Sequence, residues 1–254
     1  MKIASWNVNS LKVRLPHLLE WLASAQPDVV ALQETKTVDE SFPHEEIEAA
    51  GYHVVFSGQK TYNGVAILSK IAAQDVITDL PGLEDPQRRV LFATIGDVRI
   101  MDVYVPNGSE VGSEKYVYKL NWLEHLQRAL EAELKAHEKV VLLGDFNIAP
   151  DDRDVHDPEG WKDKILCSTP EREALQGLLD AGICDTFRKF EQEEASFSWW
   201  DYRAAGFRRN LGLRIDLILA SKAMCDDCSA SEIDKVPRGW ERPSDHAPVI
   251  ATFG

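Results

Sequence analysis

VLLGDFNIAP, residues 141–150, is an apolar run that ends in polar side chains. The apolar part predicts a buried β-strand over residues 139–145. Asp145 and Asn147 follow at a spacing of two, which places both side chains on one face of an extended segment. Such a pair can bind a metal ion, position a water molecule, hydrogen-bond a phosphate or only cap a turn. This stretch alone leaves these alternatives open.

The beginning of the chain has the same form. KIASWN (2–7) predicts a strand, and Asn7 and Asn9 lie at its end. Ligands of layered α/β folds bind at such strand ends. Two sheets packed face to face, each with its own polar strand end, would meet in one cleft. We therefore expect a single domain, residues 1–254, built from two halves.

The rest of the chain alternates between strand and helix patterns. Helices are predicted near residues 15–25, with Pro16 in the first turn, over 114–136 and over 171–182. The Gly96-Asp97 pair predicts a hairpin turn. Further strands are predicted at 28–33, 52–58, 64–70, 89–95, 98–105, 214–221 and 248–253.

Composition indicates a globular chain. Of 254 residues, 44% are hydrophobic and 28% are charged, which is enough for a core. No apolar run approaches the roughly 18 residues that a membrane-spanning helix needs. The N-terminus also lacks the apolar region of a signal peptide. We expect a cytoplasmic protein with no membrane contact.

The chain has four cysteines, Cys167, Cys184, Cys225 and Cys228. The last two form CDDC, but a zinc site would need further ligands at matching spacing. We therefore expect free thiols in a reducing cytoplasm.

The net charge is −14 and the isoelectric point is about 4.9. These values argue against a nucleic-acid binder held by a broad basic surface. They do not exclude a nuclease, because active-site carboxylates that hold a divalent cation themselves lower the isoelectric point. If DNA binds, it should bind along one face, with the acidic stretches 45–48, 151–154 and 191–194 elsewhere.

Several polar residues interrupt apolar patterns. Asp216 lies within LRIDLILA (213–220), and a buried unpaired carboxylate costs on the order of several kcal/mol, so it needs a partner or a cation. Glu34 follows the strand 28–33, and Asp245 with His246 precedes the last strand. Each has a structural explanation when taken alone, as a cap, an ion pair or a core histidine. Together they lie at the same end of different strands, which indicates one site.

Hydrolysis of a phosphodiester fits this set. Glu34, Asn7 or Asn9, and Asp245 offer the hard oxygen ligands that Mg²⁺ prefers. Asp145 could orient or deprotonate the attacking water. His246, held by Asp216, could donate to the phosphate. No serine or cysteine lies in a nucleophile-elbow context, so direct attack by water is the expected route.

Taken together, the motifs resemble the exonuclease III family of bacterial Mg²⁺-dependent apurinic/apyrimidinic endonucleases, within the endonuclease–exonuclease–phosphatase fold. They occur in the family's order over essentially the whole chain. The motifs are SWNVNSLKVR (5–14), LQETK (32–36), NGVAIL (63–68), DPQRRV (85–90), YVPNG (104–108), LGDFNIAP (143–150), SWWDYR (198–203), GLRIDLIL (212–219) and PSDHAP (243–248).

The resemblance implies a fold of class α/β (α+β), a four-layer sandwich of two packed mixed β-sheets flanked by helices. It also implies Mg²⁺ as cofactor, with Mn²⁺ as a substitute. The metal ligands it implies are Glu34, Asn7, Asp245, Asp145 and Asn147. The catalytic residues it implies are Asp145, His246, Tyr104, Asn147 and Asp216, with Asn107 near the phosphate.

The resemblance also suggests how the substrate is held. Trp199, Leu213 and Ile215 would form an apolar wall for a flipped, base-less deoxyribose. Lys115 and Arg89 are candidates for phosphate contacts that position DNA without reading its sequence. Arg89 in a structural ion pair and tryptophans within the core are the alternatives.

The expected enzyme is a monomer that acts on double-stranded DNA with abasic sites or with blocked or recessed 3′ ends. It would hydrolyse the phosphodiester 5′ to an abasic site, clean 3′ ends and degrade from the 3′ end. The alternatives are a phosphohydrolase of the same fold that acts on small molecules or lipids, and a non-catalytic binding protein. The identity of the general base and the number of metal ions stay open.

Overall fold

The computed structural model describes residues 1–254. One sheet contains β1 (Lys2–Asn7), β2 (Val29–Gln33), β3 (His53–Ser57), β4 (Val65–Ser69), β13 (Cys228–Ile233) and β14 (Val249–Phe253). The other contains β5 (Gln74–Ile77), β6 (Val90–Ile95), β7 (Val98–Tyr104), β8 (Val140–Asp145), β9 (Ile183–Asp185) and β12 (Asp216–Ser221). A small ribbon pairs β10 (Trp199–Trp200) with β11 (Gly212–Leu213).

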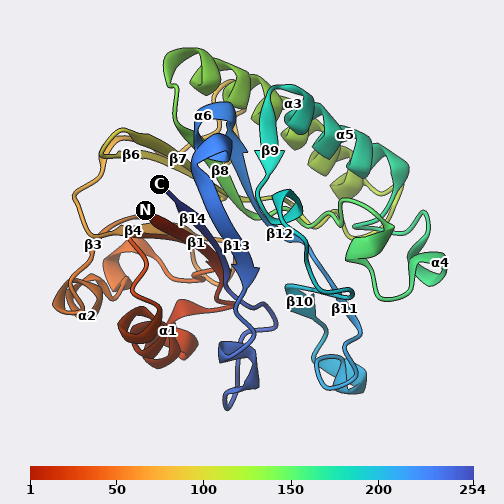
Figure 1. Cartoon of the computed structure of the whole chain (residues 1–254), viewed down its shortest axis with the longest axis horizontal. Coiled ribbons are helices and arrows are strands. Elements are labelled where there is room, and N and C mark those ends of the chain that lie inside the picture. Colours follow the sequence, from red (N-terminus) through yellow and green to blue (C-terminus); the bar gives the residue numbers. More distant parts are fainter.

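The helices are α1 (Leu11–Ala25), α2 (His44–Ala49), α3 (Glu114–Ala136), α4 (Pro158–Trp161), α5 (Thr169–Asp180) and α6 (Lys222–Asp227). Single 3₁₀ turns occur at Asp39–Ser41, Asp152–Asp154, Phe187–Lys189, Arg203–Ala205 and Pro237–Gly239. Figure 1 shows α1 and α2 on one outer side and α3 and α5 on the other, with both sheets between them.

The sheets have the orders β13-β14-β1-β2-β4-β3 and β5-β6-β7-β8-β12-β9. Alternation along the strands explains the layers. On β1, Ile3 packs between the sheets, whereas Ala4 and Trp6 face the cluster formed with α1. A third cluster joins the second sheet to α3 and α5. The architecture is the expected four-layer sandwich of two mixed sheets.

The structure corrects the predicted start of the first helix. α1 begins at Leu11 rather than near Leu15, so Pro16 lies in its second turn. The amides of Ser10 and Leu11 donate to the carbonyls of Glu34 and Thr35, at 2.8 and 3.0 Å. These tertiary hydrogen bonds hold the start of the helix, and a local pattern cannot reveal them. The longest helix, predicted over 114–136, is confirmed with those bounds.

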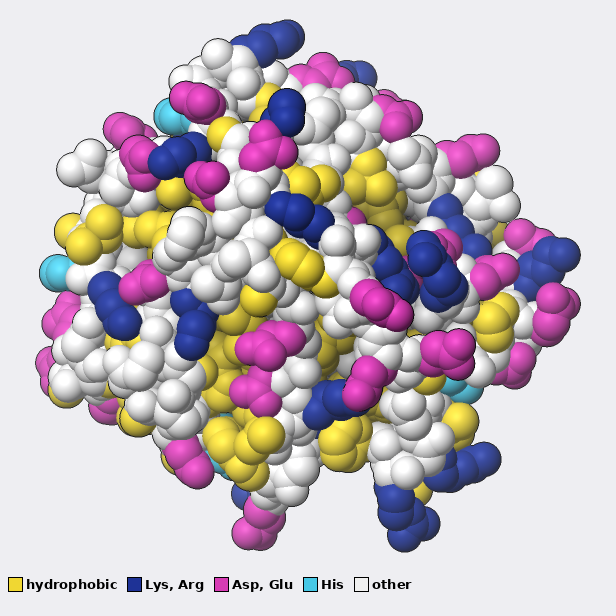
Figure 2. All heavy atoms as spheres, viewed as in Figure 1, with side chains coloured by type: hydrophobic (Ala, Val, Ile, Leu, Met, Phe, Trp, Pro, Cys, Tyr) yellow, Lys and Arg dark blue, Asp and Glu magenta, His cyan; other side chains and the backbone are white.

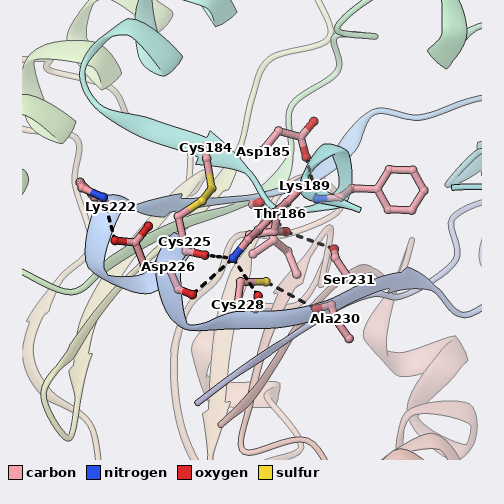
Figure 3. Close-up of a disulfide and its surroundings, with 12 residues drawn as sticks. Cys184, Asp185, Thr186, Lys189, Lys222, Cys225, Asp226, Cys228, Ala230 and Ser231 are labelled. Atoms are coloured by element: carbon pink, nitrogen blue, oxygen red, sulfur yellow. Dashed lines mark hydrogen bonds and ion pairs between the residues drawn. A yellow bond between two sulfur atoms is a disulfide. The ribbon is translucent and has the colours of Figure 1, made fainter. Parts of the chain in front are cut away.

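A second correction concerns the cysteines. Cys184 on β9 and Cys225 on α6 form a disulfide (Figure 3), whereas Cys167 and Cys228 are free and buried. The prediction of four free thiols was therefore wrong for two of them. Antiparallel pairing places Cys184 opposite Ala220 near the end of β12, and α6 follows directly. The sheet thus brings the two Cα atoms to 6.3 Å although 41 positions separate them.

None of the helices combines the length and the apolar composition that crossing a membrane would require.

Candidate active site

The strand register gathers the polar residues at one edge of the two sheets. Tyr104 at the end of β7 and Asp216 at the start of β12 both pair with Asp145 at the end of β8. In the other sheet Asn7 ends β1, and Glu34 directly follows β2, which runs parallel to it. Side chains of directly paired residues point to the same face of a sheet. The strand pairing therefore makes Tyr104, Asp145 and Asp216 neighbours.

Gly144 explains how Asp145 reaches this position. A Cβ atom at Gly144 would lie only 1.9 Å from the carbonyl oxygen of Val103 on β7, and its φ is +146°. Only glycine allows this close approach of two backbones. The glycine of LGDFN is therefore required by the packing of the strand beneath the site.

Hydrogen bonds connect the two sheets through this cluster. The Asn7 side-chain amide donates to Glu34 Oε1 at 3.0 Å and to Asp145 Oδ2 at 2.9 Å. The Tyr104 hydroxyl donates to Glu34 Oε1 at 2.8 Å. Asn7 therefore bridges a carboxylate of each sheet, the half-buried Glu34 and the buried Asp145.

His246 completes the cluster from the loop before β14. Its Nδ1 lies 3.0 and 2.9 Å from the two carboxylate oxygens of Asp216, and its Nε2 lies 3.7 Å from Asp145 Oδ2. The Ser198 hydroxyl donates to Asp216 Oδ2 at 2.6 Å. The partner that the buried Asp216 needs is thus His246, supported by Ser198.

The two asparagines lie on the other side of Asp145. The Asn147 backbone amide donates to Asp145 Oδ1 at 2.9 Å. Asn107 Nδ2 donates to Asn147 Oδ1 at 3.2 Å. Asn147 has a φ of +49° and Glu34 one of +51°, a left-handed backbone that non-glycine residues rarely adopt. Such strained positions cluster at functional sites.

Burial and neighbouring charges set the ionisation of these groups. Burial raises the pKa of Asp145 to about 7, although the nearby His246 opposes this. Burial alone would lower the pKa of His246, but Asp216 and Asp145 outweigh it and raise the pKa to about 10. Lys36 and the Asn7 amide overcome burial at Glu34 and lower its pKa. At neutral pH the site therefore holds a cationic histidine, an ionised Glu34 and a carboxyl that can exchange a proton.

A cavity of about 420 Å³ opens beside this cluster. Its lining includes Glu34 and Tyr104 from the site, and Asn107, Lys36, Arg89 and Lys115 around it. Arg89 forms no ion pair with a carboxylate. Its guanidinium instead stacks on the Tyr104 ring, 4.6 Å from the centroid, and donates to the Tyr104 carbonyl. Both predicted phosphate-contact residues thus lie at the edge of the site.

The comparisons with known proteins agree with this geometry. Residues 4–246 match the model of the Endonuclease/Exonuclease/phosphatase family. The chain belongs to that family. Within it, the chain is 39% identical to exodeoxyribonuclease III of Haemophilus influenzae, with all of both chains covered, and is therefore a member of the exodeoxyribonuclease III family.

Two solved structures are similar over the whole chain. One, at 50% identity with a TM-score of 0.98, is the 3′ phosphatase NExo from Neisseria bound to a product DNA hairpin, and 99% of that chain is covered. The other, at 38% identity with a TM-score of 0.96 and 99% coverage, is an AP endonuclease from Archaeoglobus fulgidus. Membership of the exodeoxyribonuclease III family makes the protein a hydrolase of phosphodiester bonds.

The donor set of this family member suits a hard divalent cation. Carboxylate oxygens of Glu34 and Asp145 lie within 4.8 Å of each other. The Lys36 ammonium already contacts Glu34 Oε2 at 2.8 Å and Asn9 Oδ1 at 2.5 Å, so a positive charge rests against these oxygens. Carboxylate and amide oxygens are typical Mg²⁺ ligands. The residues of the site therefore fit a divalent metal ion.

Asp245 hydrogen-bonds to Asn9 and Trp199 rather than to Glu34 or Asp145. Its two oxygens accept from Asn9 Nδ2 at 2.9 Å and from Trp199 Nε1 at 3.0 Å. Asp245 thus connects the loop after β1 to the tryptophan ribbon.

The three residues of the predicted apolar wall meet in one small cluster. Leu213 and Ile215 are fully buried there together with Leu166, and Trp199 packs against them half-buried. Trp200 is fully buried in a separate cluster, which agrees with a role in the core. The wall residues are thus together, but Leu213 and Ile215 are covered in this conformation.

The sequence reasoning missed three residues that touch the site. Ser198 holds Asp216, Lys36 pairs with Glu34, and Lys119 donates to the backbone of Asn107 and Asn147. The first two stand inside quoted motifs. Lys119 had a signal of its own, because its spacing to Leu123, Leu126 and Leu130 places it on the apolar face of α3.

Proposed function

We propose that the protein is a Mg²⁺-dependent DNA-repair nuclease that cleans blocked 3′ ends, degrades duplex DNA from the 3′ end and incises 5′ to abasic sites. One observation carries the proposal: Asp145 is buried between the imidazole of His246 and the amide of Asn7, with Glu34 hydrogen-bonded to the same amide. Acid, base and metal ligand thus converge where a phosphodiester can be attacked.

Asp145 is the proposed general base. A base is most effective when its pKa lies near the working pH, and burial raises that of Asp145 to about 7. Asn147 would help to place the attacking water, because its backbone amide orients Asp145. His246, cationic and fixed by Asp216, would donate to the phosphoryl oxygens as their charge grows. Tyr104 and Asn107 would contact the phosphate from the cavity side.

The metal would be held by Glu34 and Asp145, with Asn7, Asn147 and Asp245 around them, and Mn²⁺ would substitute for Mg²⁺. When bound, it would supply positive charge that stabilises the phosphoryl oxygens and activates water. The low pKa of Glu34 suits this role, since a ligand carboxylate must be ionised.

Duplex DNA is the proposed partner despite the acidic chain. Most of the face in Figure 2 mixes basic and acidic side chains, but basic groups project from the lobe below β10 and β11. The loop of that lobe exposes Arg203, Arg208 and Arg209. Together with Lys115 and Arg89 at the cavity, these residues would contact the phosphate backbone without reading sequence.

Processing of 3′ ends should be the stronger activity. Leu213 and Ile215 are covered, so an abasic deoxyribose would have to displace Trp199 or its neighbours before entering, whereas a 3′ terminus would enter the open cavity beside Glu34 and Tyr104. The similar Neisseria structure is described as a 3′ phosphatase and the similar Archaeoglobus structure as an AP endonuclease, so both reactions occur on this scaffold.

We further propose that the protein is a single-domain monomer that works in the cytoplasm.

Three labelled duplexes test the proposal, one with an abasic analogue, one with a 3′-phosphate and one with an undamaged recessed 3′ end. Each is incubated with the protein in Mg²⁺, in Mn²⁺ and in EDTA. We expect metal-dependent release of the 3′-phosphate and shortening of the recessed end, with slower incision 5′ to the abasic site. Activity in EDTA would contradict the metal role. Failure with all three duplexes would reject the nuclease and favour a small phosphoester as substrate.

A further inference from the structure

Lys119 on α3 is a completely buried lysine next to the site. An ammonium group has three N–H donors. Here all three are used: Nζ lies 2.7 Å from the carbonyl oxygen of Asn147, 3.1 Å from that of Asn107 and 2.5 Å from Glu171 Oε1. The lysine therefore binds the backbone of both asparagines of the proposed site, Asn107 at the phosphate and Asn147 at the attacking water.

Its counter-ion Glu171 is equally buried and equally satisfied. Besides Lys119, Glu171 accepts from the Leu166 amide at 3.1 Å, and from the Ser168 amide and hydroxyl at 3.1 and 2.6 Å. Glu171 belongs to the first turn of α5, where a carboxylate also interacts favourably with the helix dipole. The ion pair is thus rigid, with hydrogen bonds at both ends.

The surroundings leave the lysine little freedom. A Cβ atom at Gly108, next to Asn107, would lie 3.1 Å from Lys119 Cδ, so the lysine stem packs directly against this loop. The Asn147 backbone that it binds is left-handed, with a φ of +49°. Asparagine tolerates this conformation better than most residues, and contacts to its backbone help to hold it in place. Lys119 provides one of these contacts at the Asn147 carbonyl.

We infer that Lys119, anchored by Glu171, is a positioning residue that holds Asn107 and Asn147 in the geometry needed for the reaction. It does not touch the substrate. It acts through the two backbone carbonyls, and the Asn107–Asn147 hydrogen bond of 3.2 Å couples the two side chains. This inference rests on the proposed roles of the two asparagines.

Lys119→Met tests it, because methionine fills a similar volume and removes all three donors. We expect kcat to fall by about 10- to 100-fold, as for other supporting partners of active-site groups, with KM changed far less. The matched control is Arg99→Met. Arg99 is also buried and pairs with Glu133 of the same helix at 2.8 Å, remote from the asparagines. Both variants should lower Tm, but only Lys119→Met should lower kcat.

A double variant separates positioning from loss of stability. Lys119→Met leaves the Glu171 charge unpaired, and adding Glu171→Gln removes that charge while keeping an acceptor for Ser168. The double variant should regain Tm but not kcat, since the asparagine carbonyls still lack their donor. Recovery of kcat together with Tm would overturn the inference. If Lys119→Met alone does not fold, the double variant is used to measure kcat in its place.

Two further readouts complete the test. In an Asn147→Ala background, Lys119→Met should lower kcat only a little further, whereas fully additive losses would show that Lys119 does not act through Asn147.

The side-chain amide NMR signals of Asn107 and Asn147 should shift in Lys119→Met and not in Arg99→Met. Unchanged signals would overturn the inference. The NMR result is independent of turnover, so an inactive wild-type protein would reject the proposed function while Lys119 is still tested.

Discussion

His246 and Asp216 form a buried pair in which one imidazole nitrogen faces both carboxylate oxygens, at 3.0 and 2.9 Å. The other nitrogen thereby points to Asp145, 3.7 Å away. Asp216 fixes the ring orientation and stabilises its positive charge, so in the proposed mechanism the two carboxylates have different tasks. One orients the histidine, and the other remains available to exchange a proton.

Asp216→Asn should therefore reduce turnover without loss of the fold. The amide cannot compensate the imidazolium charge, and it can hold the wrong histidine tautomer. We expect kcat to fall by about 10²- to 10⁴-fold, the usual contribution of an acid–base group. Steady-state kinetics on a 3′-phosphate duplex, with circular dichroism as the folding control, measure this. A folded variant with wild-type kcat would remove the pair from the mechanism.

Asp145→Asn should abolish turnover while DNA binding persists. The amide has nearly the same shape but cannot accept a proton, so we expect a loss of at least about 10²-fold in kcat. Binding is measured by fluorescence anisotropy with a labelled duplex. Asp97→Asn is the control, since Asp97 is an exposed aspartate in the β6–β7 turn, paired with Lys139. Full activity of Asp145→Asn would exclude Asp145 as the base.

Asp102→Asn should alter the pH dependence of stability. Burial between the sheets raises the pKa of Asp102 well above 3.8, even though Gln33 donates to it. In the unfolded chain Asp102 loses its proton near its ordinary pKa, while the native carboxyl keeps it. Stability therefore falls as pH rises between these two values, by about 1.4 kcal/mol per unit.

Asp102→Asn has no ionisable group at this position, so it does not lose stability in this way as pH rises. Its free energy of unfolding should therefore improve relative to wild type as pH rises above the ordinary pKa of an aspartate. Urea denaturation of both proteins at several pH values measures the difference. A difference that stays constant with pH would mean that Asp102 is ionised in the folded protein.

Reduction of the Cys184–Cys225 disulfide should lower stability but not kcat. A bond that closes a loop of 41 residues contributes about 2–4 kcal/mol. Cys184 pairs with Ala220, four residues along β12 from Asp216, which is roughly 13 Å. Tm and kcat of the Cys184→Ser/Cys225→Ser variant report the two effects, with Cys167→Ser as control. A large loss of kcat would show that the bond supports the site after all.

The sequence by itself determined most of the strands and the longest helix, and it predicted the polar residues that the fold gathers at one edge of the sheets. An apolar run that ends in an acid or amide, as in VVLLGD and KIASWN, predicts a strand with polar groups at its end. Strand alternation then fixes which side chains share a face. For this reason Asn7, Glu34, Asp145, Asp216 and His246 could be named before the structure was known.

The tertiary structure alone decided which of these groups touch. The disulfide, the Ser198–Asp216 hydrogen bond and the three contacts of Lys119 join residues 41, 18 and up to 52 positions apart. No local pattern encodes such pairs, because they depend on strand register and on how the helices pack against the sheets. Lys119 shows this most clearly. Its place on the apolar face of α3 could be predicted from the sequence, but its partners lie in two loops and in α5, which only the fold brings together.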